Sequence, residues 1–191
     1  MDDPETEASF YHVYGLFIAR WNSLEEVFKI LLQICSGGNS AVKILTEQMT
    51  NRERANALLN IIKIHERSQA FLPFVTHAVS YFERLEQYRN YYVHEIRPLG
   101  TMDVETGRYA ALSATTKLHR DGINTRAAIV KVEEIESLSD HCIAAGKFIS
   151  DLVVHLAIMP EGFPLPPLEP LPDLPAGFSL PYQKADARDH P

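Results

Sequence analysis

Cysteine is scarce in this chain: Cys35 and Cys142 are the only two among 191 residues. They form no CxxC pair and no Cys/His cluster lies close to them, which argues against a structural zinc site. Both lie within apolar helical patterns, so we expect reduced thiols in the core of a cytoplasmic protein rather than a disulfide. No motif calls for a metal or another cofactor, and we expect none.

Long hydrophobic runs are also lacking. No apolar stretch reaches the length that is needed to cross a bilayer. The first residues, Met1–Glu5, are rich in acidic side chains, whereas a signal peptide begins with basic ones. The sequence therefore predicts a protein without a membrane partner.

Basic residues are outnumbered by acidic ones. The chain has 18 Lys and Arg against 25 Asp and Glu, which gives a formal net charge of -7 at pH 7. Nonspecific binding of nucleic acid depends on a broad basic surface, which this composition does not favour. Any contact with nucleic acid must therefore use a small, local basic cleft.

Helical periodicity dominates what is present. Hydrophobic residues make up 46% of the chain, enough for one sizeable core, and they recur at steps of three and four. Gly37-Gly38 ends the first helix, Ser40 can cap the second, Thr50–Glu53 is a capping box for the third, and Pro73 suits the first turn of the fourth. Whether the second and third form one kinked helix stays open. We expect helices over about 8–35, 40–49, 50–67, 73–96 and 132–158.

The helical period is lost between about 99 and 131. Glu105–Gly107 and Asp121-Gly122 are turn signals, and the segments between them are rich in Tyr, Thr, Ile and Val. We expect a small β-hairpin or meander inserted before the last long helix. The chain thus divides into a helical domain, 1–159, and a C-terminal arm, 160–191.

The arm holds nine of the twelve prolines. Its stretch Pro164–Pro172 favours polyproline II geometry. We favour an extended arm that lies on the protein's own surface or on a second subunit. The alternative is a peptide ligand for another protein, because Pro167–Pro170 matches an SH3-ligand pattern.

Arg89 stands where an apolar residue is expected. At 100° per residue it falls near the middle of the apolar stripe of its helix, one heptad after Phe82. A guanidinium cannot lose its proton there, so it must be paired or line a polar cleft. Asn90 and His94 lie one turn apart on the flank of this stripe. Such a group predicts a site for an anion such as phosphate.

Less specific interpretations of these residues stay open. Arg89 can be a structural residue paired with Glu86, and His94 can cap the helix C-terminus. The tyrosines of the motif can stack bases, although core or interface packing is their commoner use. A basic cluster near the second β turn can guide RNA or be a solvated hairpin tip; it comprises Lys117, His119, Arg120 and Arg126.

The order of elements and the four residues between Arg89 and His94 resemble the HEPN superfamily, helical domains common in prokaryotic toxin and defence systems. That resemblance implies an up-and-down bundle of about four helices with the motif late in a core helix. We therefore expect a mainly α, up-and-down four- to five-helix bundle. A variant of the family has Tyr two positions after the His, where this chain has Ile96, so that subgroup is disfavoured.

The resemblance also implies cleavage of RNA without a metal, by attack of the neighbouring 2′-OH on the phosphate. In that chemistry His94 transfers protons, Arg89 stabilises the charged phosphate, and Asn90 orients the imidazole or contacts the phosphate. Arg89 and His94 lie about 140° apart around an ideal helix, so we expect a homodimer that brings two copies of the motif together. An antitoxin or regulatory protein is a further expected partner.

Two other functions stay open at this stage. A non-catalytic module of the same fold would bind a nucleotide, RNA or protein, and the acidic net charge keeps this alternative in play. A purely structural interaction domain would depend on the proline-rich arm. The presence of both Arg89 and His94 favours the endoribonuclease.

Overall fold

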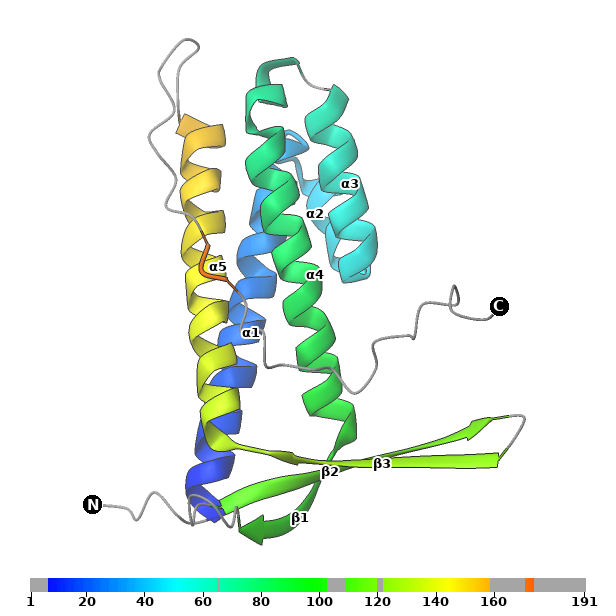
Figure 1. The fold of residues 1–191 in the computed structure, drawn as a ribbon. Coiled ribbons are helices and arrows are strands. Elements are labelled where there is room, and N and C mark those ends of the chain that lie inside the picture. Colours follow the sequence, from blue (N-terminus) through cyan, green and yellow to red (C-terminus); the bar gives the residue numbers. More distant parts are fainter. Residues whose placement is uncertain (1–6, 65, 103–108, 120–121, 159–170, 174–191) are drawn as a thin grey trace.

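Helices and a small sheet form the bundle drawn in Figure 1. The structure is a computed structural model, and it describes residues 7–64, 66–102, 109–119, 122–158 and 171–173. The mainly α architecture and the β-meander before the last long helix are confirmed. The elements are α1 (Glu7–Cys35), α2 (Ser40–Gln48), α3 (Asn51–Ile64), the 3-10 helix η1 (Glu66–Phe71), α4 (Leu72–Glu95), β1 (Ile96–Met102), β2 (Tyr109–His119), β3 (Gly122–Val130) and α5 (Val132–Ile158).

The ends of the first helices follow from local signals in the sequence. Gly37 and Gly38 have φ of 88° and 68°, and the Gly38 amide donates to the Gln33 carbonyl at 2.8 Å, which closes α1 with a Schellman motif. The cap of α2 is Asn39 rather than Ser40, because the Asn39 side chain accepts from the Val42 amide at 2.9 Å.

The capping box at Thr50 is confirmed. The Thr50 amide donates to Glu53 Oε2 at 2.7 Å, and the Glu53 amide donates to Thr50 Oγ1 at 3.3 Å. This box starts α3 at Asn51, so α2 and α3 are two helices and not one kinked helix. α3 ends at Ile64, earlier than the predicted end near Arg67, and the chain continues into η1.

α1, α3 and α5 run in one direction and α4 returns between them, as the up-and-down prediction requires (Figure 1). Aromatic rings join α1 to α4: Phe82 stacks on Phe28 with centroids 4.3 Å apart and on Trp21 at 5.1 Å. Arg20 of α1 reaches α5, where its Nη1 donates to Ser139 Oγ at 2.8 Å. None of the described helices combines the length and the apolar character needed to span a membrane.

The sheet has the order β1-β2-β3 and is antiparallel throughout. The predicted insertion, 99–131, begins earlier than expected, because α4 passes directly into β1 at Ile96. Pro98 lies within β1, where the pairing register shifts between Arg97 and Gly100; a proline has no amide to donate and is tolerated at such an irregularity. Ala111 and Val130 belong to the core cluster, so the sheet covers the lower end of the bundle in Figure 1.

The C-terminal arm touches the bundle at the one described stretch, 171–173. Leu171 is only 9% exposed and belongs to the core cluster, whereas Pro172 and Asp173 are exposed. This packing agrees with an arm that lies on the protein's own surface at this point. The rest of the arm, including Pro167–Pro170, lies outside the described residues, and its predicted roles stay predictions.

Candidate functional site

Arg89, Asn90 and His94 lie in the last two turns of α4, next to the end that continues into the sheet (Figure 1). Asn90 and His94 are exposed, and Arg89 is half-buried. The motif therefore lies at the surface of the bundle, as expected from the position of the helix end. α1 lies on one side of this segment, and α3 begins farther from the sheet.

The prediction that Arg89 lies in the middle of the buried stripe is wrong. The buried residues of this part of α4 are Leu85, Tyr88 and Tyr92, and Arg89 lies about 60° to one side of their centre. On the side of α5, Tyr81 and Tyr92 belong to the buried face, since Tyr81 contacts His141 and Tyr92 contacts Glu134. Tyr88 and Tyr92, 1% and 2% exposed, are core residues, which confirms the packing interpretation.

Arg89 is held on one side and unpaired on the other. Its Nη1 donates to Asn90 Oδ1 at 2.9 Å. Its Nε is buried and has no hydrogen-bond partner among the described residues, a state shared by Trp21 Nε1 and His155 Nδ1. Of these three nitrogens, only the Nε of Arg89 belongs to a group that is always charged. The arrangement leaves part of a guanidinium fork without an acceptor.

The structural alternative for Arg89, an ion pair with Glu86, is not found among the described residues. Glu86 Oε1 instead accepts from Asn51 Nδ2 of α3 at 2.9 Å. Tyr14 of α1 lies within electrostatic reach of Arg89: burial raises the pKa of this phenol, and the guanidinium opposes that rise.

His94 lies on another face of α4 than Arg89. It is exposed and lies about 140° around the helix from Arg89, given the geometry of an α-helix. The structure thus brings Arg89 and Asn90 together and leaves His94 on another face of the same helix end. A single phosphate cannot easily meet both the guanidinium and the imidazole of one chain.

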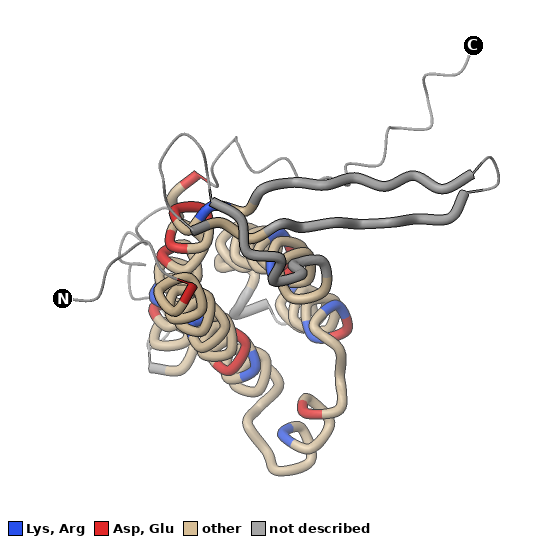
Figure 2. Tube along the Cα trace, turned by 90° about the horizontal axis from the view of Figure 1, so that it is seen from below, with Lys and Arg blue, Asp and Glu red and all other residues tan. Residues whose placement is uncertain are grey.

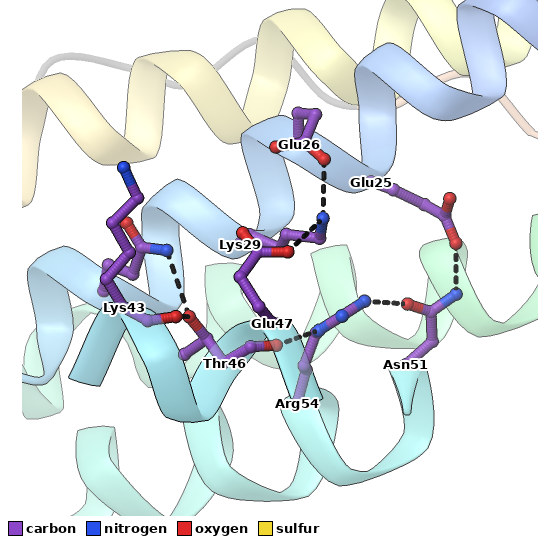
Figure 3. Close-up of polar contacts among 9 residues, drawn as sticks. Glu25, Glu26, Lys29, Lys43, Thr46, Glu47, Asn51 and Arg54 are labelled. Carbon is purple, nitrogen blue, oxygen red and sulfur yellow. Dashed lines mark hydrogen bonds and ion pairs between the residues drawn. The ribbon is translucent and has the colours of Figure 1, made fainter. Parts of the chain in front are cut away.

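Figure 3 shows a polar network between α1, α2 and α3 that the sequence did not predict. It reaches α4 at Glu86, one turn before Arg89. Asn51 Nδ2 donates to Glu25 Oε1 at 2.6 Å as well as to Glu86, and Asn51 Oδ1 accepts from Arg54 Nη1 at 2.7 Å. Arg54 is 8% exposed, and its Nε donates to the Thr46 carbonyl at 2.9 Å. The apolar period of α3 signals this burial, because Arg54 precedes Leu58 and Ile62 by one and two turns.

This network fixes the α2–α3 pair on the long helices. Each buried polar atom that it contains has a partner, as buried polar networks require. Lys29 extends it along α1, with Nζ bonded to Glu26 at 2.6 Å and to Glu47 of α2 at 3.1 Å (Figure 3). The network is therefore a structural support, and it holds α4 at Glu86, one turn before Arg89.

Further buried polar pairs lie between α4 and α5. Tyr81 Oη and His141 Nδ1 are 2.5 Å apart, and Tyr92 Oη donates to Glu134 Oε2 at 3.2 Å. Burial lowers the pKa of His141 and raises that of Glu134. Sequence reasoning gave His141 no role; its place on the apolar side of α5 was the available signal. These pairs join two helices, and neither includes His94.

The two cysteines are free thiols, as predicted. Burial raises the pKa of Cys35 to about 11 and that of Cys142 to about 12, so both are protonated at neutral pH. Neither is a candidate nucleophile. Among the described residues, no group of three or more His, Cys, Asp or Glu side chains could hold a metal ion.

Charge is dispersed over the described surface. Figure 2 shows acidic and basic residues interspersed along the helices, without a broad basic face in the part of the chain that is described. The predicted basic cluster belongs to the β2–β3 hairpin, where Lys117 pairs in register with Asn124 and Arg126 with Thr115. Arg120 lies outside the described residues.

In comparisons with protein-family models, curated proteins and solved structures, none matches this chain.

Proposed function

We propose that this protein is a metal-independent endoribonuclease of the HEPN type, in which Arg89 of one protomer and His94 of another act on one phosphate of an RNA chain. A role as a toxin or as a defence or stress effector suits such an activity, and an antitoxin or regulatory protein would then be a further partner. The observation that carries the proposal is the half-buried Arg89 with its unpaired Nε, held by Asn90, together with an exposed imidazole on another face of the same helix end.

The unpaired Nε supports an anionic ligand. Leaving a buried donor of a charged group without an acceptor costs free energy, and such groups in native proteins commonly have a functional cause. A phosphate supplies oxygen acceptors in the planar geometry that a guanidinium matches. Asn90 holds Nη1 through the 2.9 Å bond. Because Nε is screened from solvent, we expect the guanidinium to turn outward when a phosphate binds.

The separation of Arg89 and His94 supports a shared site. In an isologous interface the same surface patch of both protomers meets across a twofold axis. An axis beside the end of α4 would therefore place Arg89 of one protomer opposite His94 of the other. Both residues lie in the last two turns of α4, close to such an axis. Homodimerisation is thus part of the proposal.

The chemistry follows from the groups that are present. The 2′-oxygen of a ribose attacks the adjacent phosphorus and forms a bond to it, while the bond from phosphorus to the 5′-oxygen of the next nucleotide breaks. His94 takes the proton of the 2′-OH, and the departing 5′-oxygen receives a proton from an imidazolium or from water. Arg89 stabilises the charge that builds on the phosphoryl oxygens. The products are a 2′,3′-cyclic phosphate and a 5′-OH end.

The decisive measurement is RNA cleavage by the purified chain in EDTA. We expect the parent to produce cyclic phosphate ends, and we expect Arg89→Ala and His94→Ala each to lower the cleavage rate by at least about a hundredfold, the usual range for a proton-transfer or charge-stabilising group. Lys43→Ala, an exposed cation on α2, is the matched control and should cleave like the parent. Equal cleavage by parent and His94→Ala would refute the proposal.

Mixing the two inactive variants tests the shared site separately. A mixed dimer of Arg89→Ala and His94→Ala protomers holds one intact Arg89–His94 pair if the pair spans two chains and none if it lies within one chain. Random exchange should therefore restore about a quarter of the parent activity, since half of the dimers are mixed and each has one of two sites. No recovery after exchange would exclude a composite site. Specific RNA binding without cleavage by any variant would favour the non-catalytic module.

A further inference from the structure

Two tyrosines of α1 lie on the flank of the bundle that Arg89 borders. Tyr11 precedes Lys29 by about five helical turns, and Tyr14 precedes Glu25 by about three, so each pair shares one side of α1. Farther up, Lys29 and Glu25 contact α2 and α3 through Glu47 and Asn51. Tyr11 and Tyr14 therefore project toward the side of the bundle that α2 and α3 occupy.

The same flank of α4 carries the motif. Asn90 follows Glu86 by one turn, and Glu86 contacts Asn51 at the first residue of α3. α3 runs from that point away from the sheet (Figure 1). Tyr11 is 43% exposed and Asn90 is exposed, so solvent reaches this flank below α3.

The rings of Tyr11 and Tyr14 both pack against the buried ring of Phe10. Phe10 is 2% exposed, and its ring packs edge-on against Tyr11 with centroids 5.9 Å apart and parallel to Tyr14 at 6.5 Å. Tyr14 is half-buried and lies within electrostatic reach of Arg89, which counteracts the rise of the phenol pKa caused by burial. Both rings thus pack on the buried Phe10, and Tyr14 lies within electrostatic reach of the guanidinium.

We infer that Tyr11 and Tyr14 form a nucleobase subsite, which stacks a base of single-stranded RNA next to the phosphate held by Arg89. This inference rests on the proposed function, because it takes Arg89 as the phosphate contact. Every base has a π face, so aromatic platforms bind single strands with little sequence preference. Stacking also supplies affinity that does not depend on a basic surface, which suits a chain of net charge -7.

The geometry separates the two halves of such a ligand. Arg89 and Asn90 of α4 meet the backbone, whereas Tyr11 and Tyr14 of α1 meet the base. A nucleotide unit is long enough to extend from one helix to its neighbour. The two halves can therefore be removed one at a time, in the protein and in the ligand.

The test is binding of a short, labelled, single-stranded oligonucleotide with 2′-fluoro sugars, which has no 2′-OH and cannot be cleaved by this route. Its partner ligand has the same backbone with abasic central positions. We expect the parent to bind the base-containing strand about tenfold more tightly, as one stacked base provides. Tyr11→Leu and Tyr14→Leu should lose most of this preference. Arg89→Ala should weaken binding of both strands by a similar factor.

Two controls keep the result specific. Leu16→Ala removes a side chain of similar exposure, 41%, from another face of α1 and should bind like the parent. Tyr14→Phe keeps the ring and should keep the preference for bases. Because Tyr11 is nearly half exposed, Tyr11→Leu should fold normally. If Tyr14→Leu does not fold, the binding preference of Tyr11→Leu alone tests the subsite.

The outcomes distinguish the subsite from the catalytic proposal. A parent preference for bases that Tyr11→Leu abolishes supports the subsite, even if RNA in EDTA stays uncut. Cleavage that depends on Arg89 and His94, with base preference unchanged in Tyr11→Leu and Tyr14→Leu, overturns the subsite and leaves the endoribonuclease intact. Equal binding of both strands by the parent also overturns the subsite.

Discussion

At the residue scale, the guanidinium groups of Arg54 and Arg89 differ in how their hydrogen-bond donors are paired. Arg54 is 8% exposed and bonds to the Thr46 carbonyl and to Asn51. Arg89 is more exposed, yet its Nε has no acceptor among the described residues. A buried cation whose donors are paired is structural, whereas a half-buried one with an unpaired donor suits a ligand.

The Tyr81–His141 pair gives a pH prediction at this scale. Because burial lowers the pKa of His141 in the folded state, the unfolded chain takes up a proton first as the pH falls below about 6.5. Stability from this group is therefore present above that pH and is lost as the pH falls toward the folded-state pKa. We expect the free energy of unfolding in urea to fall less between pH 7.5 and 5.5 in His141→Gln than in the parent.

The seven other histidines are unchanged in that comparison, so the difference between the two slopes isolates His141. Tyr81→Phe provides the complementary variant, because it removes the hydroxyl group that pairs with the buried imidazole. This change should lower the free energy of unfolding by about 1–2 kcal/mol at pH 7.5. Parallel slopes for parent and His141→Gln would contradict the assignment of the pH dependence to this residue.

At the element scale, the helix ends follow from short signals, whereas the side that a helix buries does not. The capping box at Thr50 and the glycines after α1 satisfy backbone groups within a few residues, so sequence alone locates them. The buried face of α4 depends on which helices it crosses. Tyr88 and Tyr92 lie about 100° to one side of Phe82, on the face through which Tyr81 contacts His141 of α5, and the period of α4 does not predict this.

Two glycines give opposite predictions for the same substitution. Gly37 has φ of 88°, so Gly37→Ala forces a left-handed backbone on an L-residue and should destabilise the protein by about 1 kcal/mol. Gly146 lies inside α5, and a Cβ there would meet nothing within 4 Å. Gly146→Ala should therefore stabilise by roughly 0.5–1 kcal/mol. Urea unfolding of both variants checks the pair, and a like-signed change in stability would contradict it.

At the scale of the whole molecule, the bundle is closed by parts that are distant in sequence. The sheet covers one end through Ala111 and Val130, and Leu171 of the C-terminal arm joins the core cluster from beyond α5. The motif lies where α4 meets the sheet, below the α2–α3 pair (Figure 1). This placement leaves Asn90 and His94 exposed although α4 itself belongs to the core.

Leu171→Ala tests whether the arm belongs to the folded unit. Leu171 is 9% exposed, so its truncation should cost about 2 kcal/mol, the lower end for a buried leucine. Leu45→Ala on α2, where the side chain is 60% exposed, is the matched control and should change stability by less than about 0.5 kcal/mol. Equal free energies of unfolding for the two variants would show that the arm is not anchored by Leu171.

The sequence by itself determined the mainly α class, the bounds of α1 and α5, the capping box and the meander, because period and local hydrogen bonding act over a few residues. It also indicated Arg89, Asn90 and His94 as a group. Only the tertiary structure decided that Tyr88 and Tyr92 take the core positions and that Arg89 lies at their edge, within electrostatic reach of Tyr14. The reason is that burial depends on neighbours from other helices, and the periodicity of one helix does not predict where these neighbours cross it.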